Sequence, residues 1–165
     1  MNRIKKIVFA ALAAAALTGA AGAAHLDRPV QGSSSVSAGI RSSSAASEVV
    51  RLTNSARGQN GYAALVEDGA LSEAAAVRAR EIARSFSHTR PSGASFSSAL
   101  NESGVTYLRA GENIASGQKS ASEVVNAWMN SPGHRANILN SSYSRIGSAS
   151  VNIDGTLYWV QLFAD

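Results

Sequence analysis

The sequence predicts an α+β sandwich, in which helices come first and an antiparallel hairpin comes last. Apolar residues recur at helical spacing in successive segments up to residue 130. After residue 144 the apolar period changes to two, in two runs that flank Asp154-Gly155, a dipeptide typical of tight hairpin turns. Both faces of the last run, residues 157–163, are largely apolar. We therefore expect helices to cover this strand on both sides.

The length of 165 residues fits a single domain behind export and tether segments. Residues 1–24 have the pattern of a secretory signal peptide: Arg3, Lys5 and Lys6 come first, an apolar run follows, and Ala21-Gly22-Ala23 supplies a small-residue cleavage site. The apolar run is shorter than the ~20 residues that a membrane-spanning helix needs. We expect a secreted protein, extracellular or periplasmic, without a membrane span after cleavage. An uncleaved N-terminal anchor is the alternative.

The charge and the cysteine content exclude several classes of function. The predicted leader holds 3 of the 15 basic residues and none of the 11 acidic ones, so the remaining chain carries 12 − 11 = +1 with neutral histidine. Binding to nucleic acid needs a basic patch, and the remaining basic residues are scattered. The absence of cysteine excludes disulfides, thiol catalysis and sulfur ligands. Any metal would therefore be held by His, Asp or Glu.

The segment before the folded domain is predicted to be a tether. Residues 25–45 are rich in Ser and Gly and lack an apolar period, which is typical of a flexible linker. His25 lies in this segment and is interpreted as a bystander, because a histidine on a flexible segment cannot hold a fixed geometry. The domain itself is predicted over residues 46–165, and its first helix is expected to end at Gly58.

The second helix is predicted to begin after Asp68, a suitable N-cap residue. Its frequent alanines indicate close packing against a neighbour. Pro91 and Gly93 then indicate a loop. The charged residues that lie mostly off the apolar stripe of this helix are Arg78, Arg80, Glu81 and Arg84. The stripe itself is formed by Leu71, Ala75, Ala79, Ile82 and Phe86.

Shorter elements fill the middle of the domain. A short helix is predicted over residues 94–104, and β-prone residues then lead into a glycine-flanked turn at residues 111–117. The next helix opens with Ser120 and Glu123, spaced as in a capping box, and is expected to end at Pro132-Gly133. Its buried face is predicted to hold Val124, Ala127 and Trp128.

Three fragments place an ionisable residue beside Gly or Pro at the end of a predicted element. They are FSHTRPSG at residues 86–93, AGENIASG at 110–117 and WMNSPGHRANIL at 128–139. Loops that carry ionisable residues on a rigid scaffold are common places for binding and catalytic sites. Within these fragments, Asn113 and Asn137 are expected to bind neighbouring backbone groups.

In this order and spacing, GENIA, WMNSPGHRANIL and the closing YWVQLF resemble the CAP domain family, which comprises cysteine-rich secretory proteins, antigen 5 and pathogenesis-related 1. The short, secreted, cysteine-free bacterial branch is the nearest likeness, and the resemblance covers residues 46–165. It implies a three-layer α–β–α sandwich with a central antiparallel sheet. It also implies extracellular roles without one common reaction and, in some members, binding of sterols or other lipids.

The cleft of that family carries two histidines and two glutamates. Carried over onto this sequence, the histidines fall on His88 and His134, and the first glutamate falls on Glu112. The second glutamate, three residues after the tryptophan, is replaced by Ser131, so three of the four positions match. This replacement weakens any mechanism that needs two carboxylates. Glu123 lies on the same helix, but its capping role explains it more simply.

Two neutral imidazoles are ordinary ligands for zinc or a similar divalent ion, so His88 and His134 are the predicted metal ligands. Glu112 would either be a third ligand or, as we prefer, lie behind the metal and orient an imidazole through its free ring N–H. With two protein ligands, water would complete the coordination and binding would be weak. The alternative is a hydrogen-bonded His–Glu–His network that uses no cofactor.

The resulting hypothesis is a secreted CAP-domain binding module for an unidentified extracellular ligand, with a His/Glu cleft able to hold a divalent ion. The alternative is a metal-assisted, peptidase-like hydrolase at the cell envelope, whose catalytic candidates are again His88, Glu112 and His134, although the HExxH motif is missing. A further alternative is lipid or sterol binding. Ser131 could also act as a nucleophile beside His134, but nothing in the sequence marks an oxyanion hole. The oligomeric state leaves no signal in the sequence.

Overall fold

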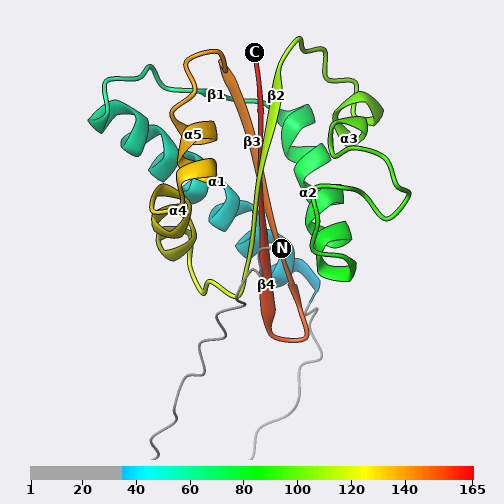
Figure 1. Cartoon of the computed structure of the whole chain (residues 1–165). Helices are drawn as coiled ribbons and strands as arrows, with labels where there is room; N and C mark the ends of the chain where they lie inside the picture. Colours follow the sequence, from blue (N-terminus) through cyan, green and yellow to red (C-terminus); the bar gives the residue numbers. More distant parts are fainter. Residues whose placement is uncertain (1–34) are drawn as a thin grey trace, which may run out of the picture. The chain divides into compact units, whose positions relative to one another are not determined.

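A central sheet flanked by helices is formed by residues 35–165, the part of the chain that the computed structural model describes (Figure 1). The predicted signal peptide, His25 and residues 25–34 of the predicted tether lie outside the described residues. The elements in chain order are α1 (Ser35–Gln59), β1 (Val66–Glu67), α2 (Gly69–Arg84), α3 (Ser97–Glu102), β2 (Ala110–Ser116), α4 (Ala121–Met129), α5 (Pro132–Ile138), β3 (Arg145–Ile153) and β4 (Thr156–Ala164).

The four strands lie in the order β1-β3-β4-β2, which makes β2 an edge strand. β4 pairs antiparallel with both β2 and β3, whereas the short β1 runs parallel to β3. Figure 1 shows α1, α4 and α5 on one face of the sheet and α2 and α3 on the other. The predicted α+β class and three-layer α–β–α sandwich are therefore confirmed, with a sheet that is antiparallel apart from β1.

β4 divides the core into two clusters. Trp159 and Phe163 point toward α1, α4 and α5, where they join the buried Trp128. Val160 and Leu162 point the other way and pack with the apolar face of α2. Successive side chains of a strand lie on opposite faces, so one largely apolar strand supplies both clusters. The prediction that helices cover both faces of this strand is confirmed.

Two predictions from local sequence are also confirmed. Asp154 and Gly155 have φ of 50° and 81° and connect β3 to β4. Positive φ at both central residues is what a type I′ hairpin turn requires. At the start of α2, the backbone N–H of Leu71 donates to Oδ1 of Asp68 at 3.1 Å. Asp68 is therefore the N-cap of this helix.

The buried face of α2 differs from the prediction at two residues. The stripe from Leu71 to Ile82 is buried, but α2 ends at Arg84, so Phe86 lies beyond it and is 55% exposed. Arg78 was predicted off the stripe and is fully buried. Both predictions are wrong. Arg78 lies four residues before Ile82, which places it on the same helical face, and a buried carboxylate partner compensates its charge.

Other differences concern where elements begin. Residues predicted as a turn at 111–117 belong largely to β2, because seven consecutive residues pair with β4, from Ala110↔Ala164 to Ser116↔Tyr158. The helix expected to end at Pro132-Gly133 ends at Met129, and Pro132 begins a separate helix, α5, because the first turn of a helix does not need the N–H that proline lacks. In α4, Val125 is buried, whereas Ala127 is exposed, contrary to the prediction.

α1 begins at Ser35, inside the segment predicted as a flexible tether. Its C-terminal part is anchored in the core by Val49 and Val50. Tertiary packing supplies most of the stability of a helix in a protein, and Ser and Ala of the preceding residues are compatible with its extension. Within residues 35–165, every helix is too short or too polar to cross a membrane.

Candidate functional site

Glu112, in the middle of β2, is the centre of the site. Its side chain is fully buried. Oε1 accepts a hydrogen bond from Nε of Arg78 at 2.7 Å, and Oε2 lies 2.7 Å from Nδ1 of His88. A carboxylate paired with arginine acts as an acceptor, so Nδ1 of His88 carries the hydrogen of this bond. In the neutral imidazole Nε2 of His88 then keeps its lone pair, on a side chain that is 56% exposed.

Arg78 is the site residue that the sequence reasoning missed. Besides binding Glu112, its guanidinium donates to Oε2 of Glu81 at 2.6 Å and to the backbone oxygen of Ser87 at 2.7 Å. Burial alone would lower the pKa of Arg78, but the hydrogen bonds to Glu112 and Glu81 raise it. Its position on the buried face of an alanine-rich helix was the available signal, because a buried arginine requires carboxylate partners.

A second arginine holds the loop that carries His88. Arg90 donates to Oε1 of Glu81 at 2.7 Å and to Oε1 of Glu102 at 2.6 Å, and these hydrogen bonds raise the pKa of Arg90. Burial alone would raise the pKa of Glu81, but hydrogen bonds from Arg90 and Arg78 lower it. The alternating charges tie the loop to α2 and α3 and so fix the imidazole of His88.

His134 enters the site from the opposite layer, on α5. Its Nδ1 lies 2.9 Å from Oγ of Ser131, and its backbone oxygen accepts from Nδ2 of Asn113 at 3.2 Å. Burial and, to a smaller extent, the nearby His88 lower the pKa of His134. Both causes favour the neutral form of the ring. Ser131 precedes the first turn of α5, yet its hydroxyl makes no capping bond to the helix and contacts the imidazole instead.

A row of amide side chains fastens α5 to the sheet. Nδ2 of Asn137 donates to the backbone oxygen of Glu112 at 3.2 Å and to Oδ1 of Asn113 at 2.9 Å. Asn113 donates to Oε1 of Gln161 at 3.1 Å, and Gln161 donates to Thr53 on α1. Asn137 is predicted to bind backbone within its own segment, but the backbone group that it binds is that of Glu112 on β2. Asn113 also binds a backbone group, but on α5 rather than within its own segment.

The fold thus brings predicted residues from three elements together. Glu112 contacts His88, and His88 is near enough to affect the pKa of His134, while Ser131 contacts His134. In the described part of the chain, no group of three or more His, Asp or Glu side chains is placed to hold a metal ion. Oε1 and Oε2 of Glu112 are bound by Arg78 and His88. A divalent ion on the two imidazoles stays a prediction.

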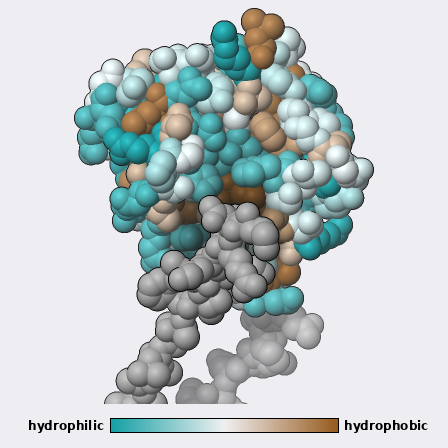
Figure 2. Space-filling model, viewed as in Figure 1, coloured by the Kyte–Doolittle hydropathy of each residue, from teal (hydrophilic) through white to brown (hydrophobic). Residues whose placement is uncertain are grey.

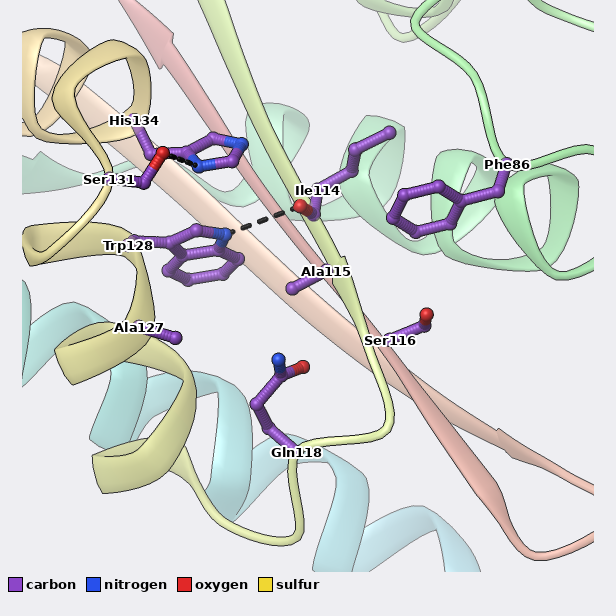
Figure 3. Close-up of a pocket in the computed structure, with 9 residues that line it drawn as sticks. All are labelled: Phe86, Ile114, Ala115, Ser116, Gln118, Ala127, Trp128, Ser131 and His134. Carbon is purple, nitrogen blue, oxygen red and sulfur yellow. Dashed lines mark hydrogen bonds between the residues drawn. The ribbon is translucent and has the colours of Figure 1, made fainter. Parts of the chain in front are cut away.

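An open groove of about 350 Å³ runs along β2 beside His134. Figure 3 shows Phe86 on one side of β2 and Trp128, Ser131 and His134 on the other. Figure 2, from the viewpoint of Figure 1, shows hydrophobic residues in the hollow between the two helical layers. The groove is lined by Phe86, Ile114, Ala115, Ser116, Gln118, Ala127, Trp128, Ser131 and His134.

Known proteins of related sequence share most of the folded part of this chain. Residues 50–163 match the sequence model of the cysteine-rich secretory protein family, CAP. The chain is 42% identical over 118 residues to the uncharacterized protein YkwD of Bacillus subtilis (strain 168). This alignment covers 70% of this chain and 45% of that protein. It is 34% identical to the uncharacterized membrane protein YlbC of the same organism, over 67% of this chain and 32% of that protein. The chain thus spans less than half the length of these relatives.

Solved structures share the fold. An extracellular protein containing an SCP domain from Bacillus anthracis str. Ames matches with a TM-score of 0.72 and 24% identity, over 84% of this chain and 45% of that chain. An outer surface protein from Borrelia burgdorferi matches with a TM-score of 0.66 and 25% identity, over 71% of this chain and 89% of that chain. The three-layer architecture is therefore shared with bacterial proteins of these descriptions.

Proposed function

Because the chain belongs to the cysteine-rich secretory protein (CAP) family, we propose that it is an extracellular binding module whose cleft weakly binds a divalent metal ion, such as zinc, on His88 and His134. The leader pattern at residues 1–24 and the extracellular and outer-surface proteins of the same fold support export. The observation that carries the metal proposal is the bond between Nδ1 of His88 and Oε2 of Glu112.

The donor set fits a weak site for a divalent ion. Glu112 keeps the ring hydrogen of His88 on Nδ1, which leaves Nε2 as a ligand. The lowered pKa of His134 favours the neutral imidazole, the form that binds metal. Ser131 can accept from Nδ1–H of that ring, which would leave its Nε2 free as well. A bound ion would act as a Lewis acid toward an oxygen or nitrogen of the ligand.

The alternative, a metal-assisted hydrolase, has less support from the geometry. A general base needs a free oxygen within hydrogen-bond reach of a reacting water. Both carboxylate oxygens of Glu112 are already bound, Oε1 by Arg78 and Oε2 by His88. Glu112 therefore suits the role of positioning His88 better than that of activating water. We accordingly propose binding rather than turnover as the activity of the cleft.

Zinc titration calorimetry on the untagged, folded chain tests this proposal. His88→Ala and His134→Ala should each lower the zinc affinity at least about tenfold, because each removes one of two protein ligands. The double variant should bind no zinc. The chain has three histidines, so His25→Ala is a matched control that should bind zinc as the wild type does.

Circular dichroism of each variant confirms that the fold is retained. Equal heats for the wild type and the double variant would refute the metal site. Loss of binding in His25→Ala would place the ion at the N-terminal segment instead.

A further inference from the structure

The outer edge of β2 presents backbone groups to the groove. Gly117 N–H donates to the backbone oxygen of Leu157 at 2.8 Å, in register with the β2–β4 ladder. Residues of an antiparallel strand alternate between bonding their partner and turning away from it. The N–H and C=O groups of Glu112, Ile114 and Ser116 therefore point away from β4.

Two side chains already bind this outer edge. Nδ2 of Asn137 donates to the backbone oxygen of Glu112 at 3.2 Å, and Nε1 of Trp128 donates to that of Ile114 at 3.3 Å (Figure 3). These bonds agree with the outward direction of the carbonyls. They also show that side chains beside this edge can reach the backbone of β2.

The outward N–H groups of Ile114 and Ser116 have no acceptor among residues 35–165. They lie two residues apart, about 7 Å along the strand. Ile114 is only 6% exposed, and unpaired backbone N–H groups are rare in buried segments. In the wall of the groove, Oε1 of Gln118 is also buried and receives no hydrogen bond from the described residues. The groove thus offers two donors and one acceptor that an incoming ligand would satisfy.

The side chains around the groove favour an uncharged ligand. None of the lining residues is Lys, Arg, Asp or Glu. Phe86 forms an exposed apolar wall on one side of β2, and Ala127 and Trp128 lie on the other (Figure 3). A phosphate or a carboxylate would find no cationic partner here. An alkyl chain would fill the apolar walls but would leave the N–H groups of Ile114 and Ser116 unpaired.

We propose that this groove binds an extended, uncharged polypeptide segment, which adds to the edge of β2 as a fifth strand of the sheet. The segment's carbonyls would accept from Ile114 and Ser116, and its alternating side chains would rest against Phe86 on one side and Trp128 on the other. This inference rests on the proposed binding function and names its ligand class. It does not require the metal ion.

A blocked peptide, acetyl-Thr-Val-Thr-Val-Thr-amide, titrated at millimolar concentration into the ¹⁵N-labelled chain, is the probe. Amide shifts should concentrate at Ile114 and Ser116, and hydrogen exchange of these two amides should slow about tenfold or more at saturation, as for newly formed sheet hydrogen bonds. The same peptide with every backbone nitrogen methylated keeps its side chains and carbonyls, but its methyl groups prevent close pairing with a strand edge, so it should bind much more weakly.

Two variants of one residue localise the effect. Ser116→Pro removes an outward N–H, at an edge position where proline is tolerated, and should weaken peptide binding about three- to tenfold. Ser116→Ala keeps that N–H and should bind within about twofold of the wild type. Zinc titration of Ser116→Pro should match the wild type, and His88→Ala, whose side chain is not among those lining the groove, should still bind the peptide. Failure of one proposal is thereby distinguishable from failure of the other.

The proposal is overturned if the peptide produces no shifts at Ile114 and Ser116. Equal binding of the methylated peptide would overturn it too, because methyl groups on the backbone nitrogens prevent a segment from lying along a sheet edge as an added strand. Equal affinities of Ser116→Pro and Ser116→Ala would show that the edge N–H is not used. The exchange measurement on the wild type stands even if Ser116→Pro fails to fold.

Discussion

At the scale of single residues, the two imidazoles of the site differ in how their tautomers are set. The carboxylate of Glu112 can only accept, so it fixes the hydrogen of His88 on Nδ1. The hydroxyl of Ser131, 2.9 Å from Nδ1 of His134, can accept or donate. The ring of His134 can therefore present Nε2 either as a ligand or as a donor. Ser131 thus permits either tautomer of His134, whereas a carboxylate at this position would fix the hydrogen on Nδ1.

Replacing Ser131 with glutamate should raise the pKa of His134. A carboxylate at this position would stabilise the imidazolium, whereas burial and the nearby His88 now lower the pKa. We expect a rise of about one pH unit or more in an NMR titration of the ring protons. Ser131→Ala, the matched control, should not raise the pKa. An unchanged or lower value in Ser131→Glu would mean that residue 131 does not set the chemistry of His134.

At the scale of elements, α2 links the hairpin to the loop that carries His88. At its start, Asp68 caps the helix and pairs with Arg145 of β3 at 3.0 Å. At Gly147 of β3, a Cβ atom would overlap the backbone of Leu71 and Ser72, so only glycine permits this close approach of helix and strand. Further along, Arg78 reaches Glu112. α2 thus sets both the contact with β3 and the position of the His88 imidazole.

Removing the cap of α2 should destabilise the fold in a way that separates hydrogen bonding from charge. Asp68→Ala loses the cap and the ion pair and should lower the free energy of unfolding by about 1–2 kcal/mol in denaturant titrations. Asp68→Asn keeps a cap acceptor and should cost less than about 1 kcal/mol. Equal losses in the two variants would contradict the capping role.

The same pair of variants has a defined pH dependence. Burial alone would raise the pKa of Asp68, but hydrogen bonds from Leu71 and Arg145 lower it. A group with a lowered folded-state pKa stabilises the protein above its unfolded pKa, near pH 4, and loses this contribution as the pH falls. The stability gap between the wild type and Asp68→Asn should therefore narrow below about pH 4.

At the scale of the whole molecule, the site is assembled from all three layers. Glu112 comes from the sheet, His88 from the loop beyond α2, and His134 from α5 on the opposite face. The arginine and carboxylate chain holds one imidazole, and the amide row from Asn137 to Gln161 holds the element that carries the other. Any change that shifts one helical layer against the sheet should therefore alter the spacing of the two rings.

The sequence could predict those features of the fold that depend on residues close together in the chain. The hairpin turn at Asp154-Gly155 and the cap at Asp68 depend on neighbouring residues, and both are confirmed. The strand around Glu112 depends on pairing with β4, far along the chain, so its residues alone indicated a turn. Pro132 suits the start of a helix as well as the end of one, and only packing decides between them.

In the site, too, local signals could be predicted and long-range pairings could not. His88 and Glu112 could be named from their fragments, and the structure places them in contact. Arg78, the partner that orients them, could not be named from the sequence, because it is 34 residues from Glu112 and the pairing depends on the fold. A charged residue on a helix is usually solvated, so the pattern placed Arg78 off the buried stripe.

The tautomer of His88 decides whether the carboxylate of Glu112 prepares this ring for a ligand. It can be read from two-bond ¹⁵N–¹H correlations of the imidazole in the metal-free, ¹⁵N-labelled chain at mildly alkaline pH. We predict a ring that is protonated on Nδ1 and unprotonated on Nε2, as the 2.7 Å contact with Oε2 of Glu112 requires. A ring protonated on Nε2 would contradict this geometry and remove the ligand on which the metal proposal depends.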